Sequence, residues 1–447
     1  MSRNLNAVLV IAASAAVSSL TSSRALAQYS FRELDTNGFT ASQVRDVANG
    51  LAVGYGVVPN GNSWLQKAIV WSTAGEGRID IGVTLKSEAL GVDNQHHIAG
   101  EARFVGLREA EAAYWPAPAP SAQSFSDELG WSTAYAVQGQ NMVGWGHRLQ
   151  GDNPVPDSAF LWNTQTRQRT TLPGPNGAPA SQGRDIDGRW VIGTAALGQN
   201  SNVGAAAWDV SDLGNVRAIK LHPDGFEYSA TSQVKGDRAV GLARATSNDL
   251  NHAYLWDLNT GAARDLQPLF PASMNVVASS ATDLRGNTVV GQALDANGDV
   301  FAVAWNLANN TVTDLRTFLP PTATMSGATA MNDDGQIVGD WRVGEDNNIY
   351  VLTPTRLVGD ADNNGIIDFD DYSRIDNGFN NHVNGWSNGD LNYDGKVDFD
   401  DYSLIDHAFN TQPGGSPGIA PVPEPASLGM TLAIAISLAM PRRRRRK

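Results

Sequence analysis

The chain has 447 residues, of which 42% are hydrophobic and only 17% are charged, which predicts more than one packed domain and argues against coiled coil. It has no cysteine, so disulfides, thiolate metal sites and cysteine nucleophiles are excluded. Its net charge of −14 argues against nucleic acid as a partner, because binding to phosphates requires clustered positive charge.

Residues 1–27 have the pattern of a secretory signal peptide. Arg3 gives a positive start, residues 7–20 are mostly apolar, and Ala25-Leu26-Ala27 forms a small-x-small cleavage site. The pattern predicts export. The alternative interpretation is a buried first helix.

Residues 28–356 contain a sevenfold repeat. An apolar-apolar-Gly motif recurs every 44–50 residues, and its glycines are Gly54, Gly100, Gly144, Gly193, Gly241, Gly291 and Gly339. In the first six units a tryptophan follows the glycine by 14–18 residues, namely Trp71, Trp115, Trp162, Trp208, Trp256 and Trp305. Residues 349–352 take this place in the seventh unit.

Each unit consists of short apolar runs rich in Val, Ile, Trp and Tyr, separated by Gly, Asn and Asp turns, which predicts four strands per unit. This period matches a β-propeller blade, so the fold class is mainly β with a seven-bladed β-propeller-like domain. Gly would allow close approach of strands and Trp would fill the space between blades. The seventh unit lacks its last strand, which residues 29–34 can supply. An open solenoid or a β-sandwich array is the competing architecture.

The repeats resemble the HAF family of extracellular repeats, whose pattern is Ile-Asn-x-x-Gly-x-Val-Val-Gly, then Ala-Phe-x-Trp, then Asp-Leu. Residues 331–339 (Met-Asn-Asp-Asp-Gly-Gln-Ile-Val-Gly) and 253–256 (Ala-Tyr-Leu-Trp) carry the resemblance, while residues 93–100 match poorly. The resemblance implies an extracytoplasmic setting and no particular reaction.

Two acidic loops in residues 357–412 align without gaps, 30 residues apart. Oxygen side chains lie at loop positions 1, 3, 5, 9 and 12, Gly lies at position 6, and position 7 offers a backbone carbonyl, which is EF-hand spacing. The sequence therefore predicts two Ca²⁺ ions, and a short helix after each loop. The predicted ligands are Asp360, Asp362, Asn364, Ile366, Asp368 and Asp371 in the first loop, and Asp390, Asn392, Asp394, Lys396, Asp398 and Asp401 in the second. The alternative is a solvated acidic linker.

The duplicated loop and exit helix, with Asp at position 12, resemble a type I dockerin, so the second domain is expected to be small, α-helical and dockerin-like. The resemblance implies a cohesin-like partner. Positions 10 and 11 of many dockerins carry hydroxyl residues that recognise the partner, whereas this chain has Phe369-Asp370 and Phe399-Asp400 there. This difference puts a known cohesin specificity in doubt.

After a Pro/Gly linker at 413–421, residues 422–447 contain Pro423-Glu424-Pro425, an apolar run at 428–441 and a basic end at 442–447. These features resemble the PEP-CTERM sorting signal. The resemblance implies a transient transmembrane anchor in the inner membrane, processing by an exosortase-type enzyme, and delivery to the cell envelope, surface or extracellular matrix. The alternative is an ordinary tail anchor.

The sequence shows no nucleophile elbow, zinc-protease motif or phosphate-binding loop. His96-His97 and the Gly144–His147 segment belong to the repeat frame, and a surface turn is the simpler interpretation of the histidine pair. The leading hypothesis is a monomeric, non-catalytic calcium-binding protein whose propeller binds a ligand or matrix polysaccharide and whose second domain docks to an envelope partner. The alternatives are a dockerin-bearing hydrolase of O-glycosyl compounds, or an accessory protein of polysaccharide catabolism, and a structural spacer.

Overall fold

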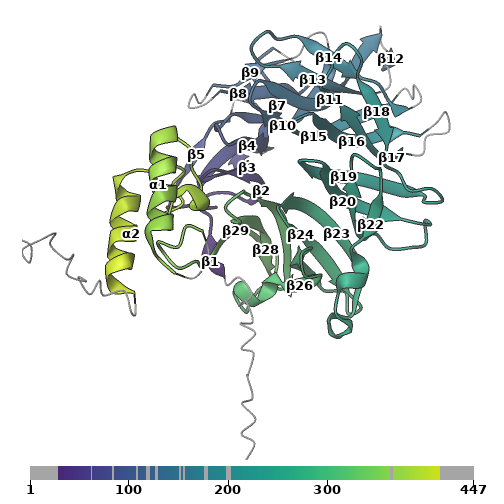
Figure 1. Cartoon of the computed structure of the whole chain (residues 1–447). Coiled ribbons are helices and arrows are strands. Elements are labelled where there is room, and N and C mark those ends of the chain that lie inside the picture. Colours follow the sequence, from purple (N-terminus) through teal and green to yellow (C-terminus); the bar gives the residue numbers. More distant parts are fainter. Residues whose placement is uncertain are drawn as a thin grey trace, which may run out of the picture.

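The structure, a computed structural model, describes residues 29–412 apart from 62, 83–84, 107–108, 117–120, 126–128, 151–152, 155–156, 176–179, 198–202 and 363–365. The predicted signal peptide, linker and sorting signal, and the predicted ligand Asn364, lie outside these residues. Seven antiparallel sheets form a ring, so the fold is mainly β with a seven-bladed β-propeller (Figure 1). No helix in the described ranges combines the length and apolarity that a membrane span requires.

Each blade is a sheet with the predicted four-strand pattern, and its strands follow chain order from the inside of the ring outwards except for the outermost strand of blade 7. Blade 1 holds β2 (Ala41–Ala48), β3 (Leu51–Asn60), β4 (Ser63–Ser72) and β5 (Arg78–Asp80), and blade 2 holds β6 (Ser87–Val92), β7 (Ile98–Ala102), β8 (Glu111–Trp115) and β9 (Gln123–Ser124). Blade 3 holds β10 (Leu129–Gln138), β11 (Asn141–Gln150), β13 (Ser158–Asn163) and β14 (Arg169–Leu172), with β12 (Asn153–Pro154) added beside β11.

The remaining blades repeat the arrangement. Blade 4 holds β15 (Ser181–Asp187), β16 (Trp190–Ala196), β17 (Val203–Asp209) and β18 (Arg217–Lys220), and blade 5 holds β19 (Tyr228–Lys235), β20 (Arg238–Arg244), β21 (His252–Asp257) and β22 (Ala263–Asp265). Blade 6 holds β23 (Val276–Arg285), β24 (Thr288–Asp295), β25 (Val300–Asn306) and β26 (Thr311–Asp314), and blade 7 begins with β27 (Met325–Met331), β28 (Ile337–Val343) and β29 (Asp346–Pro354). Short 3-10 turns follow β22 (Gln267–Leu269 and Ala272–Met274) and β26 (Leu315–Phe318).

The two ends of the repeat domain close the ring. β1 (Tyr29–Glu33) pairs antiparallel with β29 and becomes the fourth strand of blade 7, with Tyr29 opposite Pro354. The predicted closure is therefore confirmed. Pairing of the first strand with the last blade leaves the ring without a gap at which another chain could add a strand.

The repeated glycines are required by strand spacing. A Cβ built on Gly291 would lie 2.0 Å from the carbonyl oxygen of Ser280 on the neighbouring inner strand, and the other six repeat glycines have the same contact at 1.9–2.0 Å. The six tryptophans are fully buried, and the indole N–H of Trp256 donates to the carbonyl of Leu221 in the preceding blade at 2.9 Å. Both predicted roles are confirmed.

A serine in the inner strand forms a second link between blades, except in blade 1, where the buried Ser42 hydroxyl has no hydrogen-bond partner among the described residues. In six blades its hydroxyl accepts the backbone N–H of an alanine in the third strand of the preceding blade, as Ser279 does from Ala253 at 3.0 Å. The other five pairs are Ser87 with Ala68, Ser132 with Ala112, Ser181 with Ala159, Ser229 with Ala205 and Ser326 with Ala302. The sequence contains this signal, a serine 12 or 13 residues before each repeat glycine, but it was missed because serine is common in turns.

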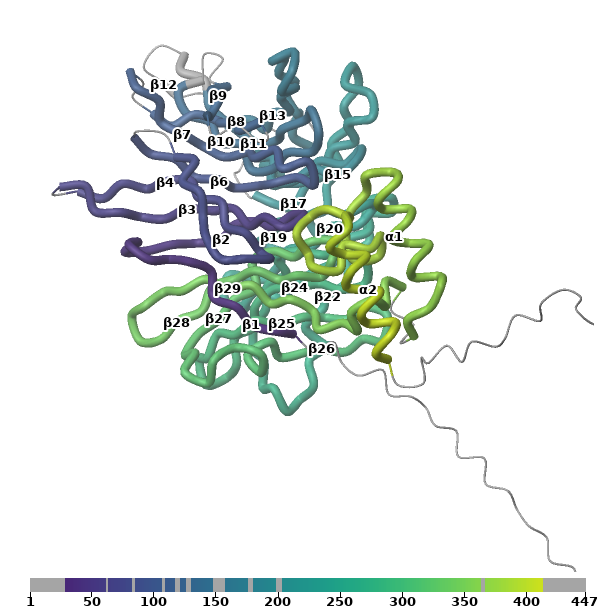
Figure 2. Tube along the Cα trace, turned by 90° about the vertical axis from the view of Figure 1, so that its left-hand side faces the viewer, coloured from purple at the N-terminus to yellow at the C-terminus, as the bar shows by residue number. Residues whose placement is uncertain are grey.

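Two helices form the second domain outside the ring (Figures 1 and 2). They are α1 (Phe369–Asn381) and α2 (Phe399–Thr411), with a 3-10 turn at Trp386–Asn388 between them. Their contacts are reciprocal: the Tyr372 hydroxyl donates to Asp406 at 2.7 Å, and the Tyr402 hydroxyl donates to Asp376 at 2.6 Å. The sequence duplication is thus an internal twofold of the fold. The helices begin three residues before the predicted Tyr372 and Tyr402.

Candidate functional site

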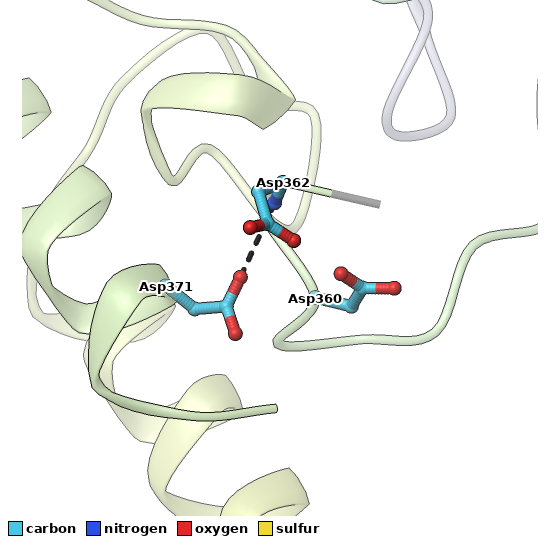
Figure 3. A group of neighbouring side chains, drawn as sticks. All are labelled: Asp360, Asp362 and Asp371. Atoms are coloured by element: carbon cyan, nitrogen blue, oxygen red, sulfur yellow. Dashed lines mark hydrogen bonds between the residues drawn. The ribbon is translucent and has the colours of Figure 1, made fainter. Parts of the chain in front are cut away.

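The first acidic loop brings three of its predicted ligands together. One carboxylate oxygen from each of Asp360, Asp362 and Asp371 lies within 4.8 Å of the other two, although Asp371 lies in the first turn of α1 and the others precede the helix (Figure 3). Asp360 and Asp371 are buried. The Asp371 carboxylate also accepts the backbone N–H of Asp362 at 3.2 Å, which folds the loop back onto the helix. Three carboxylates at this separation fit the oxygen ligands of a hard divalent cation.

Helix capping accounts for only part of this arrangement. Asp368 caps the N-terminus of α1, and Asp371 completes a capping box by accepting the backbone N–H of Asp368 at 2.9 Å. Asp398 and Asp401 make the same box at α2, with a distance of 2.9 Å. Capping explains acids at positions 9 and 12 but gives no reason for those at positions 1 and 3.

The second loop is built in the same way around different partners. Asp401 accepts the backbone N–H of Leu391 at 2.8 Å, and Asp390 accepts those of Asp394 and Gly395 at 3.1 and 3.0 Å. Burial, together with the nearby carboxylates of Asp334 and Asp401, raises the pKa of Asp390 to about 7. Mutually repelling buried carboxylates are the arrangement that a bound cation would stabilise.

The predicted loop ligands differ in exposure. Ile366 and Lys396 are exposed, as expected for residues whose predicted contribution is a backbone carbonyl. Asn392 accepts the backbone N–H of Asp394 at 2.9 Å. Within the described residues, a three-acid cluster occurs only in the first loop, because position 3 of the second loop is an amide.

The second loop contacts the propeller. The Asp334 carboxylate, in the turn between β27 and β28, accepts the backbone N–H of Trp386 at 2.6 Å. A Cβ on Gly395 would lie 2.8 Å from the carbonyl oxygen of Asn49, in the turn between β2 and β3. Blades 1 and 7 therefore support the segment that holds the second loop. The sequence could not reveal this interface, because these turns look like the other Asn- and Asp-containing turns of the repeat.

Position 10 of each loop carries an exposed aromatic ring. The exposed fraction is 78% for Phe369 and 75% for Phe399. Phe369 packs against Phe409 and Phe399 against Phe379, with ring centroids 6.2 and 5.6 Å apart. The internal twofold thus gives two equivalent apolar surfaces.

A second candidate site lies on the axis of the ring. A cavity of about 810 Å³, here called the axial cavity, is lined by the inner strands of all seven blades. Each inner strand has a β-bulge, and the bulged residue lines the cavity in every blade. These residues are Arg45, Leu90, Tyr135, Arg184, Ser232, Thr282 and Thr329.

Two carboxyl groups with raised pKa form the floor of the axial cavity. Burial raises the pKa of Asp46 to about 7 and that of Asp185 to about 8. Each also links two blades, because Asp46 accepts the backbone N–H of Val92 at 2.9 Å and Asp185 accepts that of Val234 at 2.7 Å. The sequence could not single out this pair, because it contains many other Asp and Glu residues.

Beyond this floor, ion pairs tie the blades together across the opposite end of the axis. Asp333 lies 3.2 Å from the ammonium of Lys235, 3.4 Å from the guanidinium of Arg285 and 3.2 Å from the amide of Asn94. These four residues belong to blades 7, 5, 6 and 2 and line a smaller cavity of about 270 Å³. The helical domain contacts turns at this end of the inner strands, so the axial cavity opens on the other face.

The histidines singled out in the sequence occupy turns and a strand. His97 lies 2.9 Å from the Asp93 carboxylate, and His96 lies 2.8 Å from the Asn49 carbonyl. Trp145 lies beside Trp131, with ring centroids 5.4 Å apart, and His147 lies 3.9 Å from Asp157. The Trp145–His147 segment therefore lies on blade 3, close to residues of the axial cavity.

Comparison with known proteins supports the fold and nothing finer. No protein-family model matches the chain, and no curated protein matches it. Among solved structures it is similar to TolB from Acinetobacter baumannii (15% identity, TM-score 0.38, covering 59% of this chain and 62% of that one). It is also similar to the β-propeller domain of the Trilobed protease from Pyrococcus furiosus (10% identity, TM-score 0.47, 70% and 94% covered).

A prolyl endopeptidase structure is similar at 10% identity and TM-score 0.50, with 70% of this chain and 50% of that one covered. The chain thus spans less than two thirds of TolB and half of the endopeptidase. At these identities the likeness shows the propeller fold alone.

Proposed function

We propose that the chain is an exported, non-catalytic calcium-binding protein of the cell envelope or matrix, which binds a ligand through its propeller and a partner through its helical domain. The observation that carries the calcium part is the cluster of Asp360, Asp362 and Asp371, repeated in backbone geometry around Asp401. When bound, Ca²⁺ would supply the positive charge that lets these carboxylates lie together. The protein residues place the carboxylates and start the helices.

The two ends of the propeller suit different partners. The axial cavity opens away from the helical domain, and its volume lies in the range of small-molecule sites. The helical domain presents Phe369 and Phe399 to solvent. A ligand in the cavity and a protein on the helices would therefore not compete. A cohesin-like or other envelope protein is the proposed partner, and its contact would involve these phenylalanines.

The proposed address follows from the two ends of the chain. The signal-like residues 1–27 support export, and Pro423-Glu424-Pro425 with the basic end supports an exosortase-type processing step. A chain without cysteine needs another source of rigidity outside the cell, and ring closure through β1 supplies it.

A hydrolase of O-glycosyl compounds is the second candidate function. Asp46 and Asp185 line one cavity, and a raised pKa suits a general acid. Against it, both acids have raised pKa, whereas a glycosidase pair needs one ionised carboxylate, and both accept backbone N–H groups from the next blade. One assay distinguishes the two functions. Release of reducing sugar from a panel of polysaccharides by the wild type, and its loss in Asp185→Asn, would establish that the protein is a hydrolase.

Calcium dependence tests the leading function. We expect EDTA to unfold residues 357–412 while the β signal of the propeller persists, because only the helical domain contains the acidic loops. Circular dichroism and hydrogen exchange of the full chain would measure both parts. Unchanged exchange protection of α1 and α2 in EDTA would overturn the proposal.

A further inference from the structure

The bulged residues of the inner strands differ from blade to blade, unlike the rest of the repeat frame. Serine, glycine and tryptophan recur because each has one structural task, whereas the bulge positions hold two arginines, a leucine, a tyrosine, a serine and two threonines. All seven side chains line the same cavity. A bulge re-aims a side chain, and bulges occur often beside functional sites. This variation inside one cavity is typical of a surface selected for a ligand.

One of the two arginines forms no ion pair among the described residues, although Asp157 lines the same cavity. Arg45 pairs with Glu88 at 2.7 Å, and Lys86 pairs with Glu101, another residue of the cavity wall, at 2.6 Å. Arg184 has no ion-pair partner among the described residues, and its guanidinium lies 4.2 Å from the centroid of the Tyr135 ring. Arginine binds a carboxylate through two parallel hydrogen bonds, so this group is suited to an anionic ligand.

The other polar groups of the wall that form no hydrogen bond among the described residues are hydroxyls and the side-chain amide of Gln233. Within the described part of the chain, the hydroxyls of Ser232, Thr329 and Tyr228 form no hydrogen bond, although all three line the cavity. Hydroxyl groups both donate and accept, as the hydroxyls of a sugar do. Apart from several alanines and Val203, Leu90 is the only aliphatic side chain of the wall. A ligand rich in hydroxyls therefore fits better than an apolar peptide.

Beside the wall at blade 3, next to the lining residue Tyr135, lies an aromatic surface. The indole N–H of Trp145 donates to the hydroxyl of Tyr135 at 3.4 Å, and Trp131 packs on Trp145 with 38% of its surface exposed. An exposed indole face beside a polar cavity offers apolar area to the C–H face of a sugar ring. The net charge of −14 disfavours a polyanion, so the fit is to a chain end with one acidic group.

We propose that the axial cavity binds the end of a saccharide chain that carries one carboxylate, and that Arg184 binds this carboxylate. The inference rests on the proposed ligand-binding function of the propeller and names its ligand class. The floor of the cavity is compatible with it, because burial raises the pKa of Asp185 to about 8, which leaves this carboxyl largely uncharged near neutral pH.

The test compares galacturonic acid and glucuronic acid with galactose and glucose, on the full chain, by isothermal titration with calcium and again with EDTA. We expect the acidic sugars to bind at least tenfold more tightly than the neutral ones in both conditions. Arg184→Gln should remove this preference, Arg184→Lys should restore part of it, and Arg217→Gln, an exposed arginine on the outer strand β18, should leave it unchanged.

Four outcomes overturn the inference. Equal binding of acidic and neutral sugars would reject the carboxylate while leaving the propeller a saccharide binder. Binding that is lost in EDTA would indicate a calcium bridge instead of Arg184. Unchanged selectivity in a folded Arg184→Gln protein would reject the residue. Binding of none of the sugars would reject this ligand class. A calcium titration of the same protein would then show whether the proposed calcium function stands. The preference of the wild-type protein for acidic over neutral sugars is measured without any variant. The proposal therefore stays testable even if Arg184→Gln fails to fold.

Discussion

The carboxylate of Asp334 in blade 7 accepts the backbone N–H of Trp386 in the helical domain at 2.6 Å. The indole N–H of Trp386 in turn donates to the carbonyl of Asp360, in the first acidic loop, at 2.8 Å. Trp386 also lies 5.2 Å beneath the guanidinium of Arg356, which donates to the Asp334 carbonyl at 2.7 Å. One tryptophan therefore connects the propeller to both acidic loops, since it also lies just before the second.

Replacing Asp334 by Ala should loosen the helical domain from the propeller. The backbone N–H of Trp386 would lose its acceptor, which typically costs about 1–3 kcal/mol for a buried group. We expect faster hydrogen exchange at residues 386–395 and easier proteolysis near residue 356, with little change in the melting of the ring. Asp346→Ala, an exposed acid at the first position of β29, is the control. Equal protection in both variants would show that this contact does not hold the domains together.

Replacing Gly291 by Ala should disrupt blade 6. Its Cβ would lie 2.0 Å from a backbone oxygen of β23, so the two strands must separate. Overpacking usually costs about 1–3 kcal/mol, and a backbone clash belongs at the upper end or beyond it. We expect a melting temperature several degrees lower, or insoluble protein. Gly75→Ala, where the nearest atom is 3.8 Å away, should melt like the wild type. Similar melting of both variants would refute the close-approach explanation.

Removing residues 28–36 should destabilise the whole ring and not only its terminus. β1 supplies the outer strand of blade 7, and Leu34 is buried beside Val351 in the core between blades 7 and 1. We expect a lower melting temperature and self-association, because β29 would become an exposed edge. Calorimetry and light scattering would measure both. A deletion that melts at the wild-type temperature as a monomer would contradict closure.

The acid at the cavity floor should make stability depend on pH. Burial raises the pKa of Asp185 to about 8 from a reference of 3.8, so the folded protein keeps this proton over a range in which the unfolded chain has lost it. The free energy of unfolding must then fall as the pH rises from about 4 towards 8, by at most about 1.4 kcal/mol per pH unit for this group. Asp185→Asn should therefore show a shallower loss of melting temperature between pH 5 and 8.

Asp212→Asn, an exposed acid in the turn between β17 and β18, should keep the wild-type slope. Asp46 shares the environment of Asp185, so part of the slope should survive in the Asp185 variant. Identical slopes in wild type and Asp185→Asn would show that Asp185 does not hold a proton in the fold.

The sequence predicted the blades from two repeated residue types, but it missed the repeated serine and the β-bulges as well as contacts that occur once. The spacing of glycine and tryptophan predicted the number of blades and the strand order. Every blade needs a glycine where two strands approach closely and a large side chain that fills the space between blades. The β-bulges left no signal, since any residue can occupy one, and so Arg45 and Arg184 could not be assigned to a common cavity. The contact between Asp334 and Trp386 also depends on how two domains meet, which periodicity does not encode.

The loop positions could be predicted for a different reason. Ligand spacing and helix capping act over twelve residues, so Asp360, Asp362 and Asp371 were brought together by local chemistry alone. The difference between the loops came from the second loop's surroundings: the pKa of Asp390 is raised partly by Asp334, more than fifty residues earlier in the chain.

Calcium titration of the full chain tests the central claim most directly. Isothermal titration should show two ions per chain, one lost in Asp371→Asn and the other lost in Asp401→Asn. Asp370→Asn and Asp400→Asn, which change the neighbouring acids at position 11, should each retain two. Absence of calcium uptake by the wild type, or two ions in both Asp371→Asn and Asp401→Asn, would contradict the account.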